Sequence, residues 1–315
     1  MNKKILGIGN AIVDVLAKVD DEFLKKNNLT KGSMKLINKS EFENLKKNIK
    51  IEKVVAGGSV ANTMAGIANL QGKPSFIGKI NSDNFGEMYK KSLQDINVNF
   101  TYLEKNENLS TGASIILITP DSERTMCTYL GISSHLSEND INENNILNHE
   151  LIFLEGYLWD KGISEKMFKH VINIAKKNKI KIAMSLSDIF CVTRHKQDFY
   201  NLLQNDLDIL IGNENEINEL ADKNSLLESV NQLKKLNKIL VITRSENGSM
   251  AIKNNEIINC KSIKVNKVLD LTGAGDLFAA GFLKEYLDNS EIKKCLETGS
   301  MLASKIIQKI GARLE

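Results

Sequence analysis

The stretch DLTGAGDLFAAGFL, residues 270–283, joins a glycine-rich turn to an apolar run. From Leu277 onward apolar side chains recur at helical spacing, so the glycines stand where a helix begins. The first N–H groups of a helix have no partners within it and carry the positive end of its dipole. A segment with almost no side chains at that place predicts a cup for an anion, with the carboxylate of Asp276 beside it.

A purely structural role fits the same residues equally well. Asp276 can be the N-cap of the helix, with the glycines forming a tight loop before it. The pattern alone leaves both interpretations open, so the rest of the chain has to decide between them.

Composition restricts the class of protein. With 315 residues, 42% of them hydrophobic and 26% charged, the chain fits one large α/β domain or such a domain with a small appendage. Its 42 Lys and Arg against 39 Asp and Glu give a formal net charge of +3. This balance gives no support to a nucleic-acid or membrane-surface partner, which would need a concentrated basic patch.

Cysteine usage and the first residues predict a cytoplasmic protein. The four cysteines form no CxxC pair, so they are interpreted as reduced thiols. The opening MNKKILGIGNAIVDVLA imitates a signal peptide, but Asn10 and Asp14 interrupt its apolar run and no convincing cleavage site follows. We interpret this segment as a first strand.

Short apolar runs alternate with longer helical patterns along most of the chain. The runs are KILGIG, SFIGKI, LIFLEG, IKIAMSL, DILIGN and KILVIT, with helices expected at about 60–70 and 87–93 and after several of the later runs. Runs that are apolar at consecutive positions are buried on both faces of a sheet. The pattern therefore predicts a three-layer α/β/α architecture with a mostly parallel sheet.

Two regions interrupt this alternation. Residues 11–50 and about 98–131, the latter containing TYLEKN, GASIILITP and RTMCTYLG, are typical of strands with few long helices between them. They predict a small separate β-sheet that closes over a pocket as a lid. We see no internal repeat or low-complexity linker, so residues 1–315 are expected to form a single domain.

Two familiar nucleotide motifs are absent. In LGIGNAIVD, Gly7 and Gly9 follow a strand, but Ile12 replaces the third glycine of a dinucleotide fingerprint, and no GxxxxGK[ST] occurs. Asp14 then stands just after the first strand, where a carboxylate can accept hydrogen bonds from substrate hydroxyls. A solvated loop acid is the equally open alternative.

The segment VVAGGSVANTMAGIANLQG places Gly57, Gly58 and Ser59 at the head of a helix of small residues. Missing Cβ atoms let a ligand lie against backbone, and Asn62 one turn later directs an amide towards it. Close packing of the helix on the sheet explains the alanines well and explains Asn62 less well.

Further polar segments follow later buried runs. In DILIGNENEINEL, Asn213 and Glu216 stand on the side of an open parallel sheet where ligands bind, although Asn-x-x-Glu alone favours a capping box. KILVITRSENGS leaves Thr243, Ser245 and Gly248 in a turn that can hold phosphate oxygens, or in a plain hairpin, since the strand MAIKN follows. Convergence of these segments at one sheet edge favours a single active site.

These motifs together resemble the PfkB, or ribokinase-like, family of carbohydrate and nucleoside kinases. DLTGAGDLFAAGFL is similar to its C-terminal signature, AGGSVANTMAGIANLQGKPSFIGKINSDNFGE to its N-terminal one and NENE to its NxxE motif, in family order over nearly the whole chain. The resemblance implies ATP-dependent phosphorylation of an alcohol group.

The resemblance also assigns roles to residues. Asp276 would be the catalytic base, and the N–H groups of Gly273, Ala274 and Gly275 would form the anion hole for the transferring phosphoryl group. Phosphoryl transfer needs positioning and charge neutralisation more than strong basicity. The implied ligands are Asp14, Gly57, Gly58, Ser59 and Asn62 for substrate; Asn213, Thr243, Ser245 and Gly248 for ATP; Asn213 and Glu216 for Mg²⁺, through water; and Asp270 and Thr272 for a monovalent cation such as K⁺.

One position departs from the family pattern. The family usually has TxGxxG, whereas this chain has Ser245 in place of the first glycine. This puts the nucleotide contacts of that turn in question.

The substrate follows from a finer resemblance. GNAIVDVLAKVDDEFLKKNNLTKGSMKLI and ERTMCTYLG are similar to the adenosine-kinase-like branch, which implies phosphorylation of adenosine at its 5′-hydroxyl. Met126 and Tyr129 on the lid would then pack on the base, although such residues also fit a core. A kinase of ribose, a ketohexose or a keto-deoxy sugar acid, and a non-catalytic sugar- or nucleoside-binding regulator, stay open. The exposed strand face of the lid suggests a homodimer.

Overall fold

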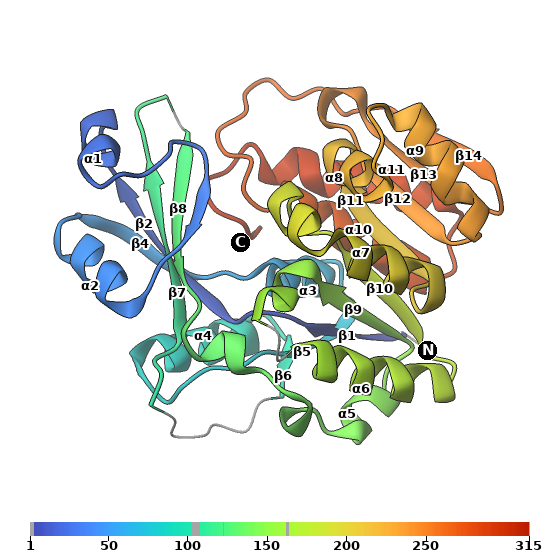
Figure 1. Cartoon of the computed structure of the whole chain (residues 1–315), viewed down its shortest axis with the longest axis horizontal. Helices are drawn as coiled ribbons and strands as arrows, with labels where there is room; N and C mark the ends of the chain where they lie inside the picture. Colours follow the sequence, from blue (N-terminus) through green and yellow to red (C-terminus); the bar gives the residue numbers. More distant parts are fainter. Residues whose placement is uncertain (1–2, 102–107, 122, 162–163, 315) are drawn as a thin grey trace.

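The computed structural model describes residues 3–101, 108–121, 123–161 and 164–314. Its large sheet has the strand order β14-β13-β12-β11-β10-β9-β1-β5-β6 (Figure 1). Pairing is parallel from β6 to β12, and β13 and β14 are added antiparallel at the far edge. The strands are β1 Lys4–Ile8, β5 Lys73–Ile77, β6 Asn99–Phe100, β9 Leu151–Glu155, β10 Lys181–Ser185, β11 Ile209–Asn213, β12 Ile239–Thr243, β13 Ser249–Lys253 and β14 Glu256–Cys260.

Helices cover both faces of this sheet, and each layer contributes to its own buried hydrophobic cluster. One layer contains α3 Ser59–Asn69, α4 Asn84–Asp95, α10 Ala274–Leu287 and α11 Ile292–Ile306. The other contains α5 Glu143–Leu147, α6 Ser164–Lys177, α7 Ile189–Asn205, α8 Glu214–Ala221 and α9 Leu226–Leu233. The predicted mostly parallel α/β/α architecture is therefore confirmed. Short 3-10 helices lie at Gly131–His135, Glu138–Asp140, Gly156–Lys161, Lys234–Leu236 and Ser245–Asn247.

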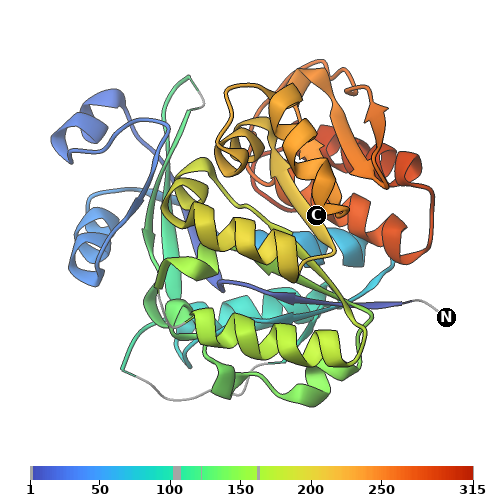
Figure 2. The ribbon, with the colours of Figure 1, turned by 45° about the vertical axis from the view of Figure 1, so that its right-hand side comes forward.

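A second, smaller sheet stands beside the large one (Figures 1 and 2). Its order is β3-β8-β7-β2-β4, with β3 Met34–Leu36, β8 Arg124–Tyr129, β7 Gly112–Ile118, β2 Ile12–Lys18 and β4 Ile51–Ala56. Helices α1 Asp21–Lys26 and α2 Lys39–Lys47 lie on its outer side, away from the large sheet. The inner face of the small sheet points towards the large sheet (Figure 1).

The expected boundaries of the lid need two corrections. Strand β4 lies beyond residue 50, because it is the edge strand that returns the chain from α2 to the start of α3. Strand β6 pairs with β5 and so belongs to the large sheet. Of the expected strand TYLEKN, residues 102–106 lie outside the described residues. The role of the small sheet as a lid stays a prediction.

Helix α10 is held closely on two sides because glycines and alanines face its neighbours. A Cβ added to Gly281 would lie 2.7 Å from the carbonyl of Thr298 in α11, and one added to Gly66 of α3 would lie 2.6 Å from the Cβ of Ala280. Such distances leave no room for a side chain. The position of α10, and hence of its first turn, is fixed by both contacts.

Among the described residues, no helix has the length and apolar character that a membrane crossing requires.

We expect Gly281→Ala to destabilise the fold by about 1–3 kcal/mol, because the added methyl group must push α10 and α11 apart. Denaturant unfolding measures the free energy. Gly275→Ala is the matched control, since a Cβ there would meet no atom within 4 Å. Equal stability of the two variants would contradict the close packing of these helices.

Candidate active site

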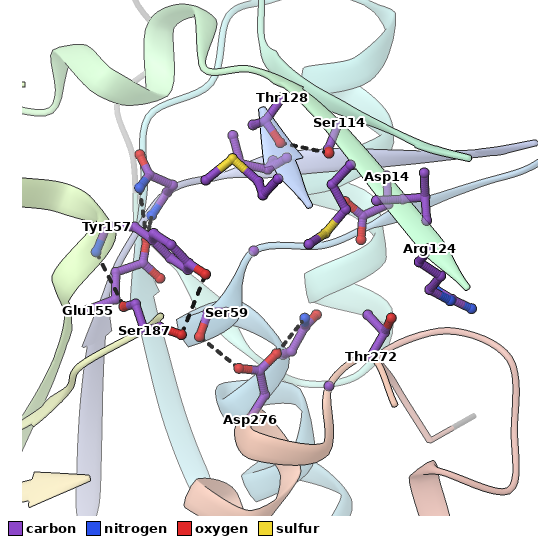
Figure 3. Close-up of a pocket in the computed structure, with 18 of the residues that line it drawn as sticks. Asp14, Ser59, Ser114, Arg124, Thr128, Glu155, Tyr157, Ser187, Thr272 and Asp276 are labelled. Atoms are coloured by element: carbon purple, nitrogen blue, oxygen red, sulfur yellow. Dashed lines mark hydrogen bonds between the residues drawn. The ribbon is translucent and has the colours of Figure 1, made fainter. Parts of the chain in front are cut away.

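A pocket of about 460 Å³ lies between the inner face of the small sheet and the carboxyl ends of neighbouring strands of the large sheet (Figure 3). Asn10, Glu155 and Ser187 line it from the ends of β1, β9 and β10. The carboxyl edge of a parallel sheet is where open α/β folds bind their ligands. The pocket brings together these predicted site residues: Asp14, Gly58, Ser59, Asn62, Thr272, Gly273 and Asp276.

Asp276 receives hydrogen bonds from the start of a neighbouring helix. Ser59 Oγ donates to its Oδ1 at 2.7 Å, and Asn62 Nδ2 donates to its Oδ2 at 3.0 Å. Burial raises the pKa of Asp276 to about 6, while these two donors and the charge of Arg313 act in the opposite direction. The two hydrogen bonds fix the orientation of the Asp276 carboxylate. Its pKa nevertheless lies near neutral pH, so it can change protonation state there.

The interpretation of Asp276 as an N-cap is wrong. Gly273 occupies the N-cap of α10 with φ 78°, no side chain caps this helix start, and Asp276 stands within the first turn. A Cβ on Gly273 would lie 2.7 Å from backbone atoms of Ala312, so this glycine is required by packing. Gly275 has open space where its side chain would be. Packing therefore does not explain Gly275, and its part in an anion hole beside Asp276 stays a prediction.

Asp14 lies within β2, and the alternative of a solvated loop acid is wrong. Burial raises its pKa to about 7, with Arg313 and Arg124 lowering it and Asp276 raising it further. A Cβ on Gly57 would lie 2.3 Å from Asp14 Oδ2. Gly57 does not line the pocket, but its missing side chain makes the space that the Asp14 carboxylate occupies.

Gly58 starts helix α3 and lies against the loop that follows β1. Its φ is 87°, and a Cβ there would lie 2.3 Å from the carbonyl oxygen of Asn10. This close approach sets the first turn of α3, from which Ser59 and Asn62 reach Asp276.

Glu155 is a buried acid of the pocket that sequence reasoning missed. It is 1% exposed, and its carboxylate accepts hydrogen bonds from the N and Nδ2 atoms of Asn10, both at 2.8 Å, and from the N of Val60 at 3.1 Å. Burial raises its pKa to about 7. The sequence does contain an indication of it: Glu155 is the acid near the end of the buried run LIFLEG, at the carboxyl edge of the sheet where ligands bind.

Arg124 was also missed, and it joins the small sheet to the body. It pairs with the buried carboxylate of Asp270, which also accepts hydrogen bonds from Thr272 N at 2.9 Å and Gly311 N at 2.6 Å. Asp270 therefore fixes the loop before α10. Its predicted role in binding a monovalent cation, together with Thr272, stays a prediction.

Asn213 and Glu216 form the capping box of α8. Glu216 N donates to Asn213 Oδ1 and Asn213 N to Glu216 Oε2, both at 3.0 Å. Burial and the nearby charge of Asp188 raise the pKa of Glu216 to about 7. Neither residue lines the pocket, although β11 is the next strand of the sheet after β10. Their proposed part in metal binding stays a prediction.

The turn after β12 is a hairpin, as its alternative interpretation predicts. Thr243 pairs with Ser249 across β12 and β13, and Arg244 N donates to Gly248 O at 2.8 Å. Gly248 has φ 84°, and a Cβ there would lie 2.1 Å from the carbonyl oxygen of Cys260. Ser245 has φ 48°, a left-handed conformation that suits the glycine of the family pattern. ATP contacts of this turn stay a prediction.

The two apolar residues expected to touch a base lie on opposite faces of β8. Met126 lines the pocket, whereas Tyr129 is 9% exposed and packs on Phe42 of α2, with ring centroids 6.1 Å apart. Side chains alternate between faces along a strand, so residues three apart cannot share one. The expectation for Tyr129 is wrong.

No cluster of three or more His, Cys, Asp or Glu side chains suited to a metal ion occurs within the described ranges. Any metal held here would therefore need water, backbone or a bound ligand among its ligands.

Comparisons with known proteins agree with this geometry. Residues 25–315 match the family model described as pfkB family carbohydrate kinase. The structure of an adenosine kinase from Sinorhizobium meliloti superimposes with a TM-score of 0.94 at 34% identity, covering 100% of this chain and 96% of that one. A probable sugar kinase from Rhizobium etli CFN 42 matches with the same TM-score and identity, covering 99% and 96%. Among curated proteins, a 5-dehydro-2-deoxygluconokinase of Listeria monocytogenes is 28% identical over 80% of this chain and 81% of its own.

We expect Ser59→Ala to raise the pKa of Asp276 above its value of about 6. The Ser59 hydroxyl donates to the carboxylate and so stabilises its ionised form, and that stabilisation is lost in the variant. The carboxyl ¹³C resonance of Asp276, followed against pH, measures the midpoint. Thr63→Val is the control, because the Thr63 hydroxyl donates to the backbone carbonyl of Asp276 and leaves its carboxylate untouched. An unchanged or lower midpoint in Ser59→Ala would contradict the assignment.

Proposed function

The chain belongs to the pfkB family of carbohydrate kinases, and from this premise we propose that it transfers the γ-phosphoryl group of ATP to the 5′-hydroxyl of adenosine. Membership makes the protein an ATP-dependent kinase that acts on an alcohol group. The observation that carries the proposal is the carboxylate of Asp276 in the pocket, beside the open space at Gly275 and the uncapped start of α10.

We assign the proton transfer to Asp276. The substrate hydroxyl gives its proton to this carboxylate while its oxygen bonds to the γ-phosphorus and the bond to the departing ADP breaks. With a pKa of about 6, Asp276 is mostly ionised above neutral pH and can accept the proton. The N–H groups of Gly273 and Gly275, at the positive end of α10, stabilise the charge on the transferring group. The N–H of Ala274, which belongs to the same proposed anion hole, donates to Leu271 O at 3.2 Å and would have to leave that carbonyl to take part.

Nucleotide and metal are assigned to the continuation of the same sheet edge. ATP is proposed to lie along Asn213 and Thr243, the last residues of β11 and β12, and along Ser245 and Gly248 in the turn after β12. Glu216 and Asn213 would hold Mg²⁺ through water, and the metal would neutralise phosphate charge. Glu216 fits this role, because burial and the nearby charge of Asp188 raise its pKa, and a cation would stabilise both carboxylates. K⁺ at Asp270 and Thr272 would depend mainly on backbone carbonyls, since three donors already engage the Asp270 side chain.

The inner face of the small sheet favours a substrate longer than one sugar ring. Asp14, Ser114 and Thr128 occupy one register row across β2, β7 and β8, and the two hydroxyls lie 2.8 Å apart (Figure 3). Because neighbouring strands are about 4.8 Å apart, Thr128 stands roughly 10 Å from Asp14. Substrate hydroxyls at Asp14, Gly58 and Asn62 therefore leave the far end of the row for a second group.

That far end suits a nucleobase. The row lies among the apolar side chains of Ile116, Met126 and Leu130, which can pack on the faces of a purine. Hydroxyls donate and accept hydrogen bonds, so Ser114 and Thr128 can meet both the amino group and the ring nitrogens of adenine.

A sugar kinase is the second candidate. Arg124 lines the pocket and offers a cation for the carboxylate of a keto-deoxy sugar acid, and the 5-dehydro-2-deoxygluconokinases are relatives of this chain. Against it, Arg124 already pairs with Asp270. Ribose and ketohexoses would use Asp14 and Asp276 but leave the hydroxyl pair unused.

We also propose that residues 1–315 act as one kinase domain in which the small sheet closes as a lid. The Arg124–Asp270 pair connects the two parts across the pocket. Closure would exclude water from the transferring phosphoryl group. A cytoplasmic location and a homodimer formed through the small sheet belong to the same proposal.

Adenosine is expected to give ADP release from MgATP, with ribose, fructose, inosine and 5-dehydro-2-deoxygluconate far slower. Asp276→Asn should lower kcat by orders of magnitude while adenosine still binds, because the amide cannot accept the proton. A coupled assay of ADP release measures turnover. Preferred turnover of a sugar or sugar acid would overturn the substrate, and wild-type rates in Asp276→Asn would overturn the base.

Gly275→Ala should lose turnover without losing stability. Its methyl group enters open space, and alanine is the better helix residue by about 0.5–1 kcal/mol. The same methyl group occupies the room proposed for the phosphoryl group. Thermal unfolding and ADP release are measured on the same variant. Full activity in a stable Gly275→Ala protein would show that the transferring phosphoryl group does not occupy the space at Gly275.

A further inference from the structure

The segment of residues 311–314 runs from the loop before α10 to the end of α3. Gly311 N donates to Asp270 Oδ2 at 2.6 Å, in the loop before α10. Ala312 lies against Gly273, and Asn69 Nδ2 at the end of α3 donates to Leu314 O at 2.7 Å. The 311–314 segment therefore contacts α3, which carries the two donors to Asp276, and the loop and first turn of α10, which carries Asp276 itself.

From this segment Arg313 reaches into the supporting side of the pocket. Its Nε donates to Asn62 Oδ1 at 2.9 Å, its Nη2 to the carbonyl oxygen of Gly57 at 3.2 Å and its Nη1 to Ser92 Oγ at 3.3 Å. Arg313 does not line the pocket, so it does not touch the space for substrate. Arg313 instead contacts Asn62, which lines the pocket, and Gly57, which makes room for the carboxylate of Asp14.

The contact with Asn62 decides which way that amide faces. A guanidinium group only donates hydrogen bonds, so the oxygen of the amide must face Arg313. The amide nitrogen is then directed at Asp276 Oδ2, to which it donates at 3.0 Å. In the reverse orientation, the amide oxygen of Asn62 would face the carboxylate oxygen of Asp276, and the amide nitrogen would face the guanidinium nitrogen of Arg313.

We propose that Arg313 is a positioning residue of the phosphoryl-transfer reaction, which acts through Asn62 to hold the carboxylate of Asp276 towards the substrate hydroxyl. It rests on the proposed function, because it assumes that Asp276 accepts the proton. The role is distinct from packing alone, since it depends on the donors and the charge of the side chain.

The charge of Arg313 acts in the same direction. The titratable groups around Asp276 are Asp14 on β2, Glu155 on β9 and Arg313. Arg124 of β8 lies close to Asp14, and Tyr89 of α4 has a hydrogen bond with Arg313. Arg313 lowers the pKa of Asp276 and of Asp14, while Asp276 raises the pKa of both Asp14 and Glu155. Loss of the positive charge should therefore move the ionisation of Asp276 to higher pH.

Arg313→Gln and Arg313→Lys test the proposal, with Ser92→Ala as the control. Ser92 accepts a hydrogen bond from Arg313. Among the described contacts, Ser92 has no hydrogen bond to Asn62 or to Asp276. We expect Arg313→Gln to lower kcat on the order of 10- to 100-fold and to raise the ¹³C midpoint of Asp276. Arg313→Lys should keep the midpoint near the wild-type value but still lose turnover, and Ser92→Ala should change neither.

A double-mutant cycle separates positioning from general destabilisation. If Arg313 acts through Asn62, the fold-change in kcat caused by Arg313→Gln should shrink in an Asn62→Ala background. Fully additive losses, a kcat within twofold of wild type in Arg313→Gln, or an unmoved midpoint in that variant would each overturn the proposal. If Arg313→Gln fails to fold, the same cycle is run with Arg313→Lys.

The two proposals can fail separately. Wild-type turnover by Asp276→Asn, or none by the wild-type protein with any acceptor, would defeat the proposed function. The ¹³C midpoint of Asp276 is measured without substrate, so a midpoint unchanged in Arg313→Gln would defeat the proposal for Arg313 by itself.

Discussion

The close approach of α3 and α10 is the constraint on which the site depends. Gly66 and Ala280 bring the two helices so near that no larger side chain fits between them. Both helices start at the same pocket, so their positive ends add at one place. Ser59 and Asn62 then stand within hydrogen-bonding distance of Asp276. A wider separation would leave a half-buried carboxylate without these donors, which is costly.

Burial gives the pocket its electrostatic character. Asp14, Glu155 and Asp276 are acids in one desolvated space, and their pKa values are raised to about 7, 7 and 6. Two cations lower the pKa of Asp14: Arg313 in the 311–314 segment and Arg124 in the small sheet. Charges in such a space interact more strongly than in water. The site is thus sensitive to each cation that supports it, including ones that never reach the substrate.

The sequence predicted the layers because they depend on local pattern. Continuous apolar runs marked the parallel strands, and DLTGAGD and GGSVAN marked the helix starts that meet at Asp276. Asn213 and Glu216 showed the limit of such motifs, since one spacing fits a capping box and a ligand site alike. Strand periodicity separates Met126 from Tyr129, because residues three apart in β8 face opposite sides of the small sheet. No local pattern around Arg313 pointed to the pocket.

Local order was therefore determined by the sequence alone: which segments are strands, where helices begin, and which family signatures are present. Only the tertiary structure decided which groups meet. Asn62 lies 214 positions from Asp276 and 251 from Arg313, and these three side chains form one chain of hydrogen bonds. Secondary structure reflects preferences of residues near in sequence, whereas burial, pKa shifts and donor–acceptor pairing depend on which surfaces pack together. For that reason the candidate base was found from its motif, and its supports appeared only in the folded chain.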